Sequence, residues 1–187
     1  MTRTYNVAVV GATGLVGTEM IKMLEELKFP VNVFVPLASE KSAGKTVSFL
    51  GKSYSVKPLN EKSFNRIDVA LFSAGSSVSA KFAPIAAKAG SVVIDNTSYF
   101  RMDNEVPLVV PEVNAEDIKK HKGIIANPNC STAQMVLALK PIHDRWGISR
   151  VVVSTYQATA GAGKEAMDEL LGRHSGFGRR SHERGDQ

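Results

Sequence analysis

The chain contains a single cysteine, Cys130, and its neighbours favour chemistry at the thiol. Cys130 follows Asn127-Pro128-Asn129 and precedes residues 131–139, where apolar residues recur at helical spacing. A helix N-terminus favours negative charge and so stabilises the thiolate, the form of cysteine that attacks a carbonyl carbon. A lone cysteine is also commonly a small buried apolar residue, and it forms neither an internal disulfide nor a multi-cysteine metal site. Position alone therefore leaves both interpretations of Cys130 open, and no metal site is expected.

A second candidate site is the glycine pattern Gly11, Gly14 and Gly17, which lies between a short apolar strand and a helix. Glycine in such a loop allows a tight turn and a close approach of the backbone to a pyrophosphate, which the helix N-terminus attracts. The alternative is a tight turn without a ligand, because a glycine pattern alone is weak evidence. The residues that we expect to bind a dinucleotide here are Gly11, Thr13, Gly14, Leu15, Val16 and Gly17.

The end of the second strand bears on the choice between NAD and NADP. NAD-binding domains usually place an acidic residue there for the ribose 2′-hydroxyl. Here Ser39, Lys41 and Ser42 supply hydroxyl donors and a positive charge that suit a 2′-phosphate instead. Glu40 leaves this interpretation ambiguous, and an ordinary solvated loop is the alternative.

The elements that must position these residues alternate along the chain. Strands are expected at residues 5–10, 31–37, 67–72, 92–94, 108–110, 123–126 and 151–156, with short strands within 44–58. Helices are expected at residues 18–27, 80–89, 115–120 and 131–139, with Pro84 in or near the first turn of its helix and Asn114 as an N-cap. This alternation predicts an α/β fold, a doubly wound Rossmann-type parallel sheet with helices on both faces.

Length and composition are consistent with a soluble protein of one domain, or of one domain and part of another. The chain has 187 residues, of which 43% are hydrophobic and 22% charged, and its net charge is +5. No apolar run approaches the roughly 20 residues that cross a bilayer, and no signal peptide is evident, so a cytoplasmic location is expected. The basic residues are scattered except near the C-terminus, which argues against a nucleic-acid partner.

Six motifs in order resemble those of bacterial-type aspartate-semialdehyde dehydrogenases, over about residues 5–170. They are the Gly11 to Gly17 loop, Ser73-Ala74-Gly75, Asn96 to Met102, Val110 to Asn114, Asn127 to Thr132, and Thr155-Tyr156-Gln157. The order of all six is far more specific than any one motif.

The resemblance implies a phosphorylating, NADP-dependent oxidoreductase that interconverts aspartate 4-semialdehyde and 4-aspartyl phosphate, in the biosynthesis of lysine, threonine and methionine. Cys130 is implied as the nucleophile that carries the thioester, with Gln157 orienting the substrate. Arg101 and Asn129 are implied to bind substrate and phosphate, and Ser73, Ala74 and Gly75 to line the NADP(H) site. Family members are expected to be homodimers or larger assemblies.

The expected organisation has three parts: an NADP-binding domain at residues 1–157, the start of a substrate and dimerisation domain at 158–171, and a basic tail at 172–187. The resemblance ends near Leu171, so the second domain is expected to be largely absent, together with the histidine acid/base and the carboxylate-binding arginine of the family. The tail has neither helical nor strand periodicity and is expected to be disordered, with a shifted reading frame or an artificial end as the alternative.

Three other functions stay open on the sequence. One is an NADP-binding remnant without catalysis, and another is a nucleic-acid-binding module carried by the basic tail. The third is a relative of N-acetyl-γ-glutamyl-phosphate reductase, a family that usually has Gly before its cysteine and Tyr-Pro after it. Asn129 and Ser131 flank Cys130 instead.

Overall fold

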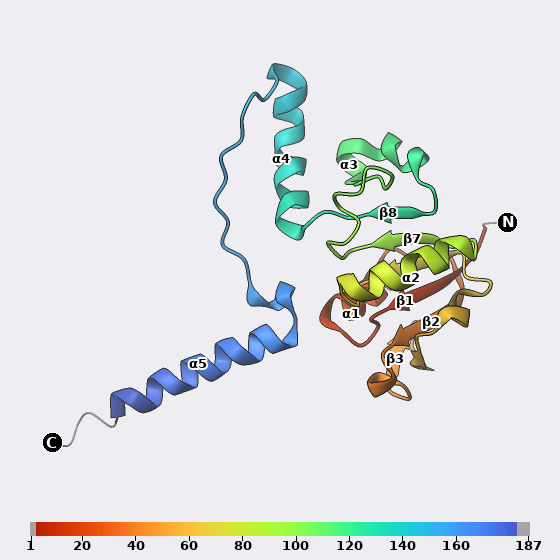
Figure 1. Cartoon of the computed structure of the whole chain (residues 1–187), viewed down its shortest axis with the longest axis horizontal. Helices are drawn as coiled ribbons and strands as arrows, with labels where there is room; N and C mark the ends of the chain where they lie inside the picture. The colour runs from red at the N-terminus through yellow and green to blue at the C-terminus, as the bar shows by residue number, and fades with distance from the viewer. Residues whose placement is uncertain (1–2, 183–187) are drawn as a thin grey trace. The chain divides into compact units, whose positions relative to one another are not determined.

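The computed structural model describes the backbone of residues 3–182 and the side chains of residues 3–173 (Figure 1). The chain divides into two compact units, residues 1–152 and residues 153–187. This division lies earlier than the predicted end of the first domain at residue 157.

The first unit is built on a six-stranded sheet in the order β5-β2-β1-β6-β7-β8, in which all neighbouring strands are parallel. The six strands are β1 (Tyr5–Val10), β2 (Val31–Ala38), β5 (Lys57–Pro58), β6 (Val69–Phe72), β7 (Val92–Asp95) and β8 (Ile124–Ala126). From β1 the chain proceeds first to β2 on one side and later to β6 on the other. The carboxyl ends of β1 and β6 therefore form the switch point at which doubly wound sheets bind ligands.

Helices cover both faces of this sheet, as predicted. The helices and single turns of the first unit are α1 (Leu15–Glu26), η1 (Glu40–Ser42), η2 (Glu61–Phe64), α2 (Ser76–Lys88), α3 (Pro111–Asn114), η3 (Ala115–Lys120) and α4 (Cys130–Trp146). Strand β1 alternates its side chains between the two faces. Val7 and Val9 pack in the cluster that includes Ile21 of α1, whereas Ala8 and Val10 pack in the cluster that includes Ala83 of α2.

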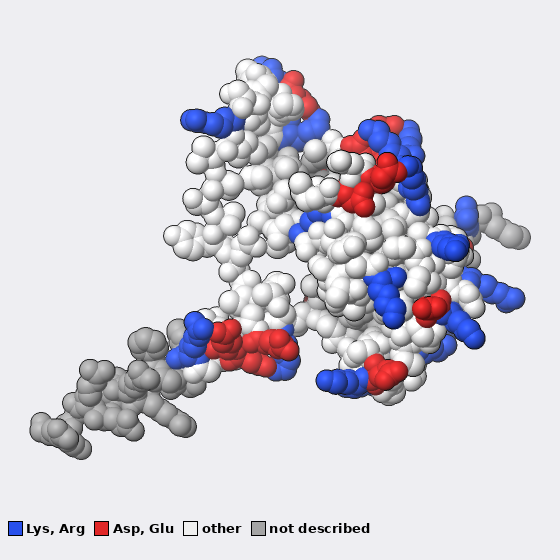
Figure 2. All heavy atoms as spheres, in the orientation of Figure 1, with Lys and Arg blue, Asp and Glu red and all other residues white. Residues whose placement is uncertain are grey.

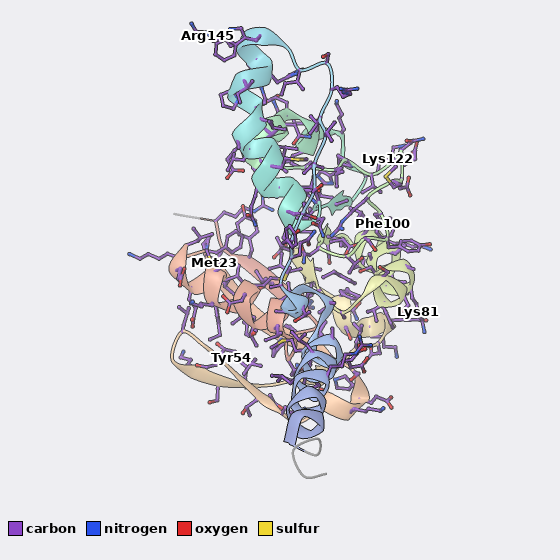
Figure 3. The ribbon with its side chains drawn as sticks, turned by 90° about the vertical axis from the view of Figure 1, so that its left-hand side faces the viewer. Met23, Tyr54, Lys81, Phe100, Lys122 and Arg145 are labelled. Carbon is purple, nitrogen blue, oxygen red and sulfur yellow. The ribbon has the colours of Figure 1, made fainter. Side chains whose placement is uncertain are left out.

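A small antiparallel hairpin, β3 (Thr46–Phe49) and β4 (Lys52–Ser55), extends the α1 side of the core. Phe34 of β2 stacks on Phe49, with 4.5 Å between the ring centroids, and meets the edge of Tyr54 at 5.1 Å. Tyr54 lies on this hairpin (Figure 3). The short strands predicted within residues 44–58 are thus confirmed.

Helices α2 and α4 differ from the predicted bounds by four residues or more. Helix α2 begins at Ser76 rather than residue 80, so Pro84 lies well inside it and not near its first turn. The proline removes one hydrogen bond to the carbonyl of Ala80, but Pro84 is exposed on the helix surface. Helix α4 continues to Trp146, beyond the predicted end at residue 139, and ends only at Gly147, whose φ is 72°.

The segment between β7 and β8 is less regular than predicted. Residues 108–110 form a single parallel bridge, Leu108 to Ala126, instead of a strand. Residues 115–120 form a 3-10 helix, and Asn114 does not cap it through its side chain. The Asn114 side chain instead accepts a hydrogen bond from the Val110 N–H and donates to the Leu108 carbonyl and to Asp117. These bonds favour a folded-back turn over an N-cap.

The predicted strand at residues 151–156 is wrong. The segment has no strand assignment, and Val152 is 84% exposed. An apolar β-branched sequence becomes a strand only when a neighbouring strand supplies its hydrogen bonds, and no ladder among the described residues includes this segment.

The second unit contains η4 (Thr159–Ala162) and α5 (Lys164–His182). Ion pairs at i,i+4 spacing, Lys164–Asp168 and Glu169–Arg173, support α5. Helix α5 continues through residue 182, which differs from the disordered tail expected from residue 172; residues 183–187 lie outside the described part of the chain. No helix in the described part of the chain is both long and apolar enough to span a membrane.

Candidate functional site

The glycine loop after β1 has a backbone shape that requires glycine at two positions. Gly11 has a φ of 89°, a region that side-chain-bearing residues rarely adopt, and its N–H donates to the Leu37 carbonyl at 2.8 Å. At Gly17 an added Cβ would lie 2.1 Å from the Gly11 carbonyl oxygen. At Gly14 an added Cβ would lie 3.4 Å from the same oxygen, an ordinary contact. Gly11 and Gly17 therefore bring the start of α1 directly against the loop.

The start of α1 suits an anion. The first N–H groups of a helix have no partner within the helix, and here Gly14 in the N-cap position makes no side-chain hydrogen bond to them. No acidic residue lies in the first turn of α1. The Leu15 and Val16 side chains are apolar and carry no hydrogen-bond donor, so these residues can contribute to an anion site only through their backbone N–H groups. The donor set fits the pyrophosphate of a dinucleotide.

A cavity of about 450 Å³ opens beside this loop. Six of the residues predicted to bind cofactor line the cavity: Gly11, Thr13, Gly14, Ser39, Ser73 and Ala74. The other predicted residues, Leu15, Val16, Gly17, Lys41, Ser42 and Gly75, do not line it. Ser73 follows β6, and its Oγ donates to the Val10 carbonyl at 3.1 Å. The loops after β1 and β6 thus meet at the switch point.

Five apolar residues that line the cavity were not predicted from the sequence: Val10, Ala38, Leu59, Val78 and Phe82. Val78 and Phe82 are four residues apart on α2, so this spacing after the Ser73 motif could have identified them. Leu59 comes from the segment after β5, which carries no motif. Apolar walls of this kind are typical of small-molecule sites.

A second cavity of about 530 Å³ shares Leu59 and Phe82 with the first. Its other lining residues are Asn60, Glu61, Lys62 and Lys81. The Lys81 ammonium lies 5.0 Å from the centre of the Phe82 ring, and Lys81 projects from α2 (Figure 3). The two cavities therefore adjoin at Leu59 and Phe82, and the Lys81 ammonium lies over the Phe82 ring.

The predicted 2′-phosphate residues occupy a single turn. Ser39 precedes η1, and its carbonyl accepts a hydrogen bond from the Ser42 N–H at 2.9 Å. The Lys41 side chain is exposed in this turn. Ser39 reaches the cavity, whereas Lys41 and Ser42 lie in the adjoining turn.

Arg101 links the carboxyl ends of two neighbouring strands. Its Nε donates to the Asn127 carbonyl at 2.9 Å and its Nη2 to the Asn96 carbonyl at 3.0 Å. Asn96 follows β7 and Asn127 follows β8, and the Asn127 amide donates to the Asn96 side-chain oxygen at 2.6 Å. A guanidinium has five N–H donors, so these two bonds fix its plane and leave donors for an anion.

Cys130 is the first residue of α4, and its side chain is exposed. Asn129 caps the helix, because its side-chain oxygen accepts hydrogen bonds from the Ser131 N–H at 3.0 Å and the Ser131 hydroxyl at 2.6 Å. The Cys130 sulfur lies 3.9 Å from the same oxygen. The predicted position of the thiol at a helix N-terminus is therefore confirmed, while its chemical role stays a prediction.

Gln157 belongs to the second unit and is exposed there. Its Nε2 donates to the Thr155 hydroxyl at 3.3 Å. Its predicted role toward the substrate stays a prediction.

Within the first unit, the glycine loop, Ser73, Arg101 and Cys130 all follow the carboxyl ends of parallel strands, so they share one edge of the sheet. The charges on the visible face of this unit are mixed in sign rather than gathered in one basic patch (Figure 2).

Two family models match the sequence. Residues 6–121 match the NAD-binding domain of semialdehyde dehydrogenases, and residues 139–186 match the dimerisation domain of the same enzymes. The second match extends past Leu171, where the resemblance was expected to end.

Individual relatives agree with these matches. An aspartate-semialdehyde dehydrogenase of Aquifex aeolicus is 64% identical over 169 residues, which are 89% of this chain and 50% of the relative. The crystal structure of aspartate semialdehyde dehydrogenase II of Vibrio cholerae complexed with ASA is 55% identical, with a TM-score of 0.88, over 91% of this chain and 52% of that one. The enzyme of Candida albicans with NADP is 29% identical, with a TM-score of 0.67, over 78% of this chain and 48% of that one. The chain spans about half the length of the curated relatives that it matches.

Proposed function

Because the chain belongs to the semialdehyde dehydrogenase family, we propose that it carries the nucleotide-binding and thiol-bearing part of an NADP-dependent, phosphorylating aspartate-semialdehyde dehydrogenase. The observation that carries the proposal is the cavity at the switch point, which six residues of the predicted cofactor site line. Enzymes of this kind would act in the biosynthesis of lysine, threonine and methionine.

In this proposal the cofactor lies along the edge of the sheet, from Ser39 to Ser73. The N–H groups at the start of α1 would hold the pyrophosphate, and Val78 and Phe82 of α2 would contact the adenosine. Ser39 and Lys41 hold the 2′-phosphate, which gives NADP its advantage over NAD. NADP, when bound, supplies the hydride acceptor for the oxidation. The structure of the Candida albicans relative with NADP supports NADP as the cofactor of this family.

Cys130 carries the covalent chemistry in this proposal. Its thiolate adds to the aldehyde carbon of aspartate semialdehyde, and the carbonyl oxygen takes up the negative charge. After oxidation the acyl group is held on the sulfur as a thioester. A phosphate oxygen then attacks the thioester carbonyl, the carbon–sulfur bond breaks, and the thiolate leaves as aspartyl phosphate forms. The exposed position of Cys130 at the start of α4 makes such an attack sterically open.

Arg101 and Asn129 position the anionic reactants. The guanidinium plane, set by two backbone carbonyls, offers its remaining donors to phosphate or to the acyl phosphate. Asn129 keeps the start of α4 in place through Ser131 and so holds the thiol. Gln157 orients the substrate carbonyl, and the dimerisation-domain match supports assembly of the intact enzyme into dimers or larger forms.

Two measurements on the 187-residue protein test the proposal. Calorimetric titration with NADP should give one site per chain. Aspartate semialdehyde, added with NADP, should then slow the alkylation of Cys130 by iodoacetamide, because the aldehyde and iodoacetamide compete for the same thiol. Intact mass follows the alkylation. A protein that binds no nucleotide, or whose thiol reacts equally fast with and without substrate, contradicts the proposal.

A further inference from the structure

Asp95 is a fully buried carboxylate at the carboxyl end of β7. It accepts three hydrogen bonds: from the Ser79 hydroxyl at 2.8 Å, the Thr97 N–H at 2.9 Å and the Thr97 hydroxyl at 2.9 Å. Ser79 lies on α2, and Thr97 lies in the turn that leads toward Arg101. A buried carboxylate is costly unless such donors surround it, so Asp95 holds α2 and this turn in one arrangement.

The same strand end also reaches the loop before Cys130. The Asp95 carbonyl accepts a hydrogen bond from the Asn127 N–H at 2.8 Å. The next residue, Asn96, bonds both the Arg101 guanidinium and the Asn127 side chain. A displacement of the Asp95 strand end would therefore move Arg101 and the Asn127 loop together.

On the other side, α2 presents one face to the cavity and another to the sheet. Val78 and Phe82 line the cavity, whereas Ser79, next to Val78, is fully buried against Asp95. Near the start of the helix, the Ser76 and Ser98 hydroxyls lie 3.0 Å apart and provide a second link between α2 and the turn after β7. A ligand that presses on Val78 and Phe82 thus acts on the same helical turn that bonds Asp95.

We propose that Asp95 is a positioning residue that couples occupancy of the nucleotide cavity to the placement of Arg101 and the Asn127 loop. The chain of contacts runs from Val78 and Phe82 through Ser79 to Asp95, and from there through Asn96 to Arg101. Packed side chains and hydrogen bonds with little freedom transmit small displacements over such distances. This inference rests on the proposed function, because it requires a nucleotide in the cavity.

The test uses adenosine 2′,5′-bisphosphate as the nucleotide, because it lacks the nicotinamide ring and so cannot cover the thiol with it. Cys130 is alkylated in parallel with iodoacetate and with iodoacetamide. The anionic reagent responds to the positive charge of Arg101, whereas the neutral reagent corrects for changes in the thiol itself. In the wild type, the nucleotide should change the iodoacetate-to-iodoacetamide rate ratio by about fivefold, the lower end of typical coupling between two sites.

Ser79→Ala removes the α2 side of the link. It should remove most of the nucleotide effect on the ratio and leave only the part that the Ser76–Ser98 link carries. The affinity for the bisphosphate should stay within about threefold, because no cavity residue changes. Asp95→Asn keeps an oxygen acceptor for Ser79 and should retain most of the effect. Ser91→Ala is the matched control, since Ser91 is also a buried serine and its hydroxyl donates to the Ile67 carbonyl. Ser91 lies just before β7, at the end of that strand opposite Asp95. This control should retain the full effect.

A merely structural role for Asp95 predicts a lower melting temperature in Ser79→Ala with the nucleotide effect unchanged, and that result would overturn the inference. If Ser79→Ala fails to fold, Thr97→Val removes the hydroxyl bond to Asp95 from the other side, keeps the backbone N–H bond and should weaken the effect. A wild type that binds the bisphosphate without any change in the ratio refutes the inference and leaves the proposed function intact. A wild type that binds no nucleotide refutes both.

Discussion

The start of α1 rests on the loop before it so closely that a Cβ on Gly17 would lie 2.1 Å from the Gly11 carbonyl oxygen. The contact is with backbone, which cannot move aside as a flexible side chain does. It sets the distance between the helix N-terminus and the end of β1, where the proposed pyrophosphate binds.

Gly17→Ala should therefore lower stability by about 1–3 kcal/mol, the usual range for overpacking, and weaken NADP binding as the helix shifts. Gly14→Ala is the control for stability, because its Cβ would make an ordinary 3.4 Å contact with the protein and its φ of −84° suits alanine. Urea unfolding and calorimetric titration measure the two effects. Equal losses in the two variants would contradict this account of the loop.

The proposed 2′-phosphate site makes a prediction about cofactor choice. The wild type should bind NADP more tightly than NAD, and Lys41→Ala should weaken NADP binding by about tenfold, as expected for a charge-assisted hydrogen bond. NAD binding should not change. Lys52→Ala, which removes another exposed lysine, is the control. Equal affinities of the wild type for NADP and NAD, measured by calorimetry, would rule out this site.

Asp117 links η3 to the pH dependence of stability. Hydrogen bonds from Lys120, 2.5 Å away, and from Asn114 hold the pKa of this carboxyl below its usual value. A lowered folded-state pKa contributes stability above the unfolded-state value, and this contribution is lost as the pH falls through the folded-state value. Asp117→Asn should therefore lower stability slightly at neutral pH and not in strong acid. Unfolding by urea at both pH values measures the difference, and an equal loss at both would exclude the pairing as its cause.

The polypeptide of residues 1–187 should bind NADP yet turn over slowly. The chain spans about half the length of the relatives that it matches, and the family resemblance leads us to expect the histidine acid/base and the carboxylate-binding arginine outside it. Acid–base help of this kind is typically worth about 10²–10⁴-fold in rate. The measurement is NADPH formation from aspartate semialdehyde and phosphate, beside a full-length relative. Turnover near that of the relative, abolished by Cys130→Ala, would show that the 187 residues or their assembly supply these groups.

The sequence by itself determined the parallel sheet, most of its strands, the glycine loop and the place of Cys130 at the start of a helix. These features are local, because hydrophobic periodicity, glycine conformation and helix capping act over a few neighbouring residues. The predicted strand at residues 151–156 failed for the converse reason. Its apolar pattern is local, but a strand also needs a neighbouring strand to bond with, and the pattern does not show whether one is present.

Only the tertiary structure decided which distant residues share a site. It brought Val78 and Phe82 into the cavity with Leu59, and it directed two Arg101 donors to the ends of β7 and β8. It also buried the Asp95 carboxylate between α2 and the turn at Thr97. The residues next to Asp95 in the sequence do not indicate that it is buried. Each of these contacts depends on which strands lie side by side, and that order follows from packing helices on both faces of the whole sheet.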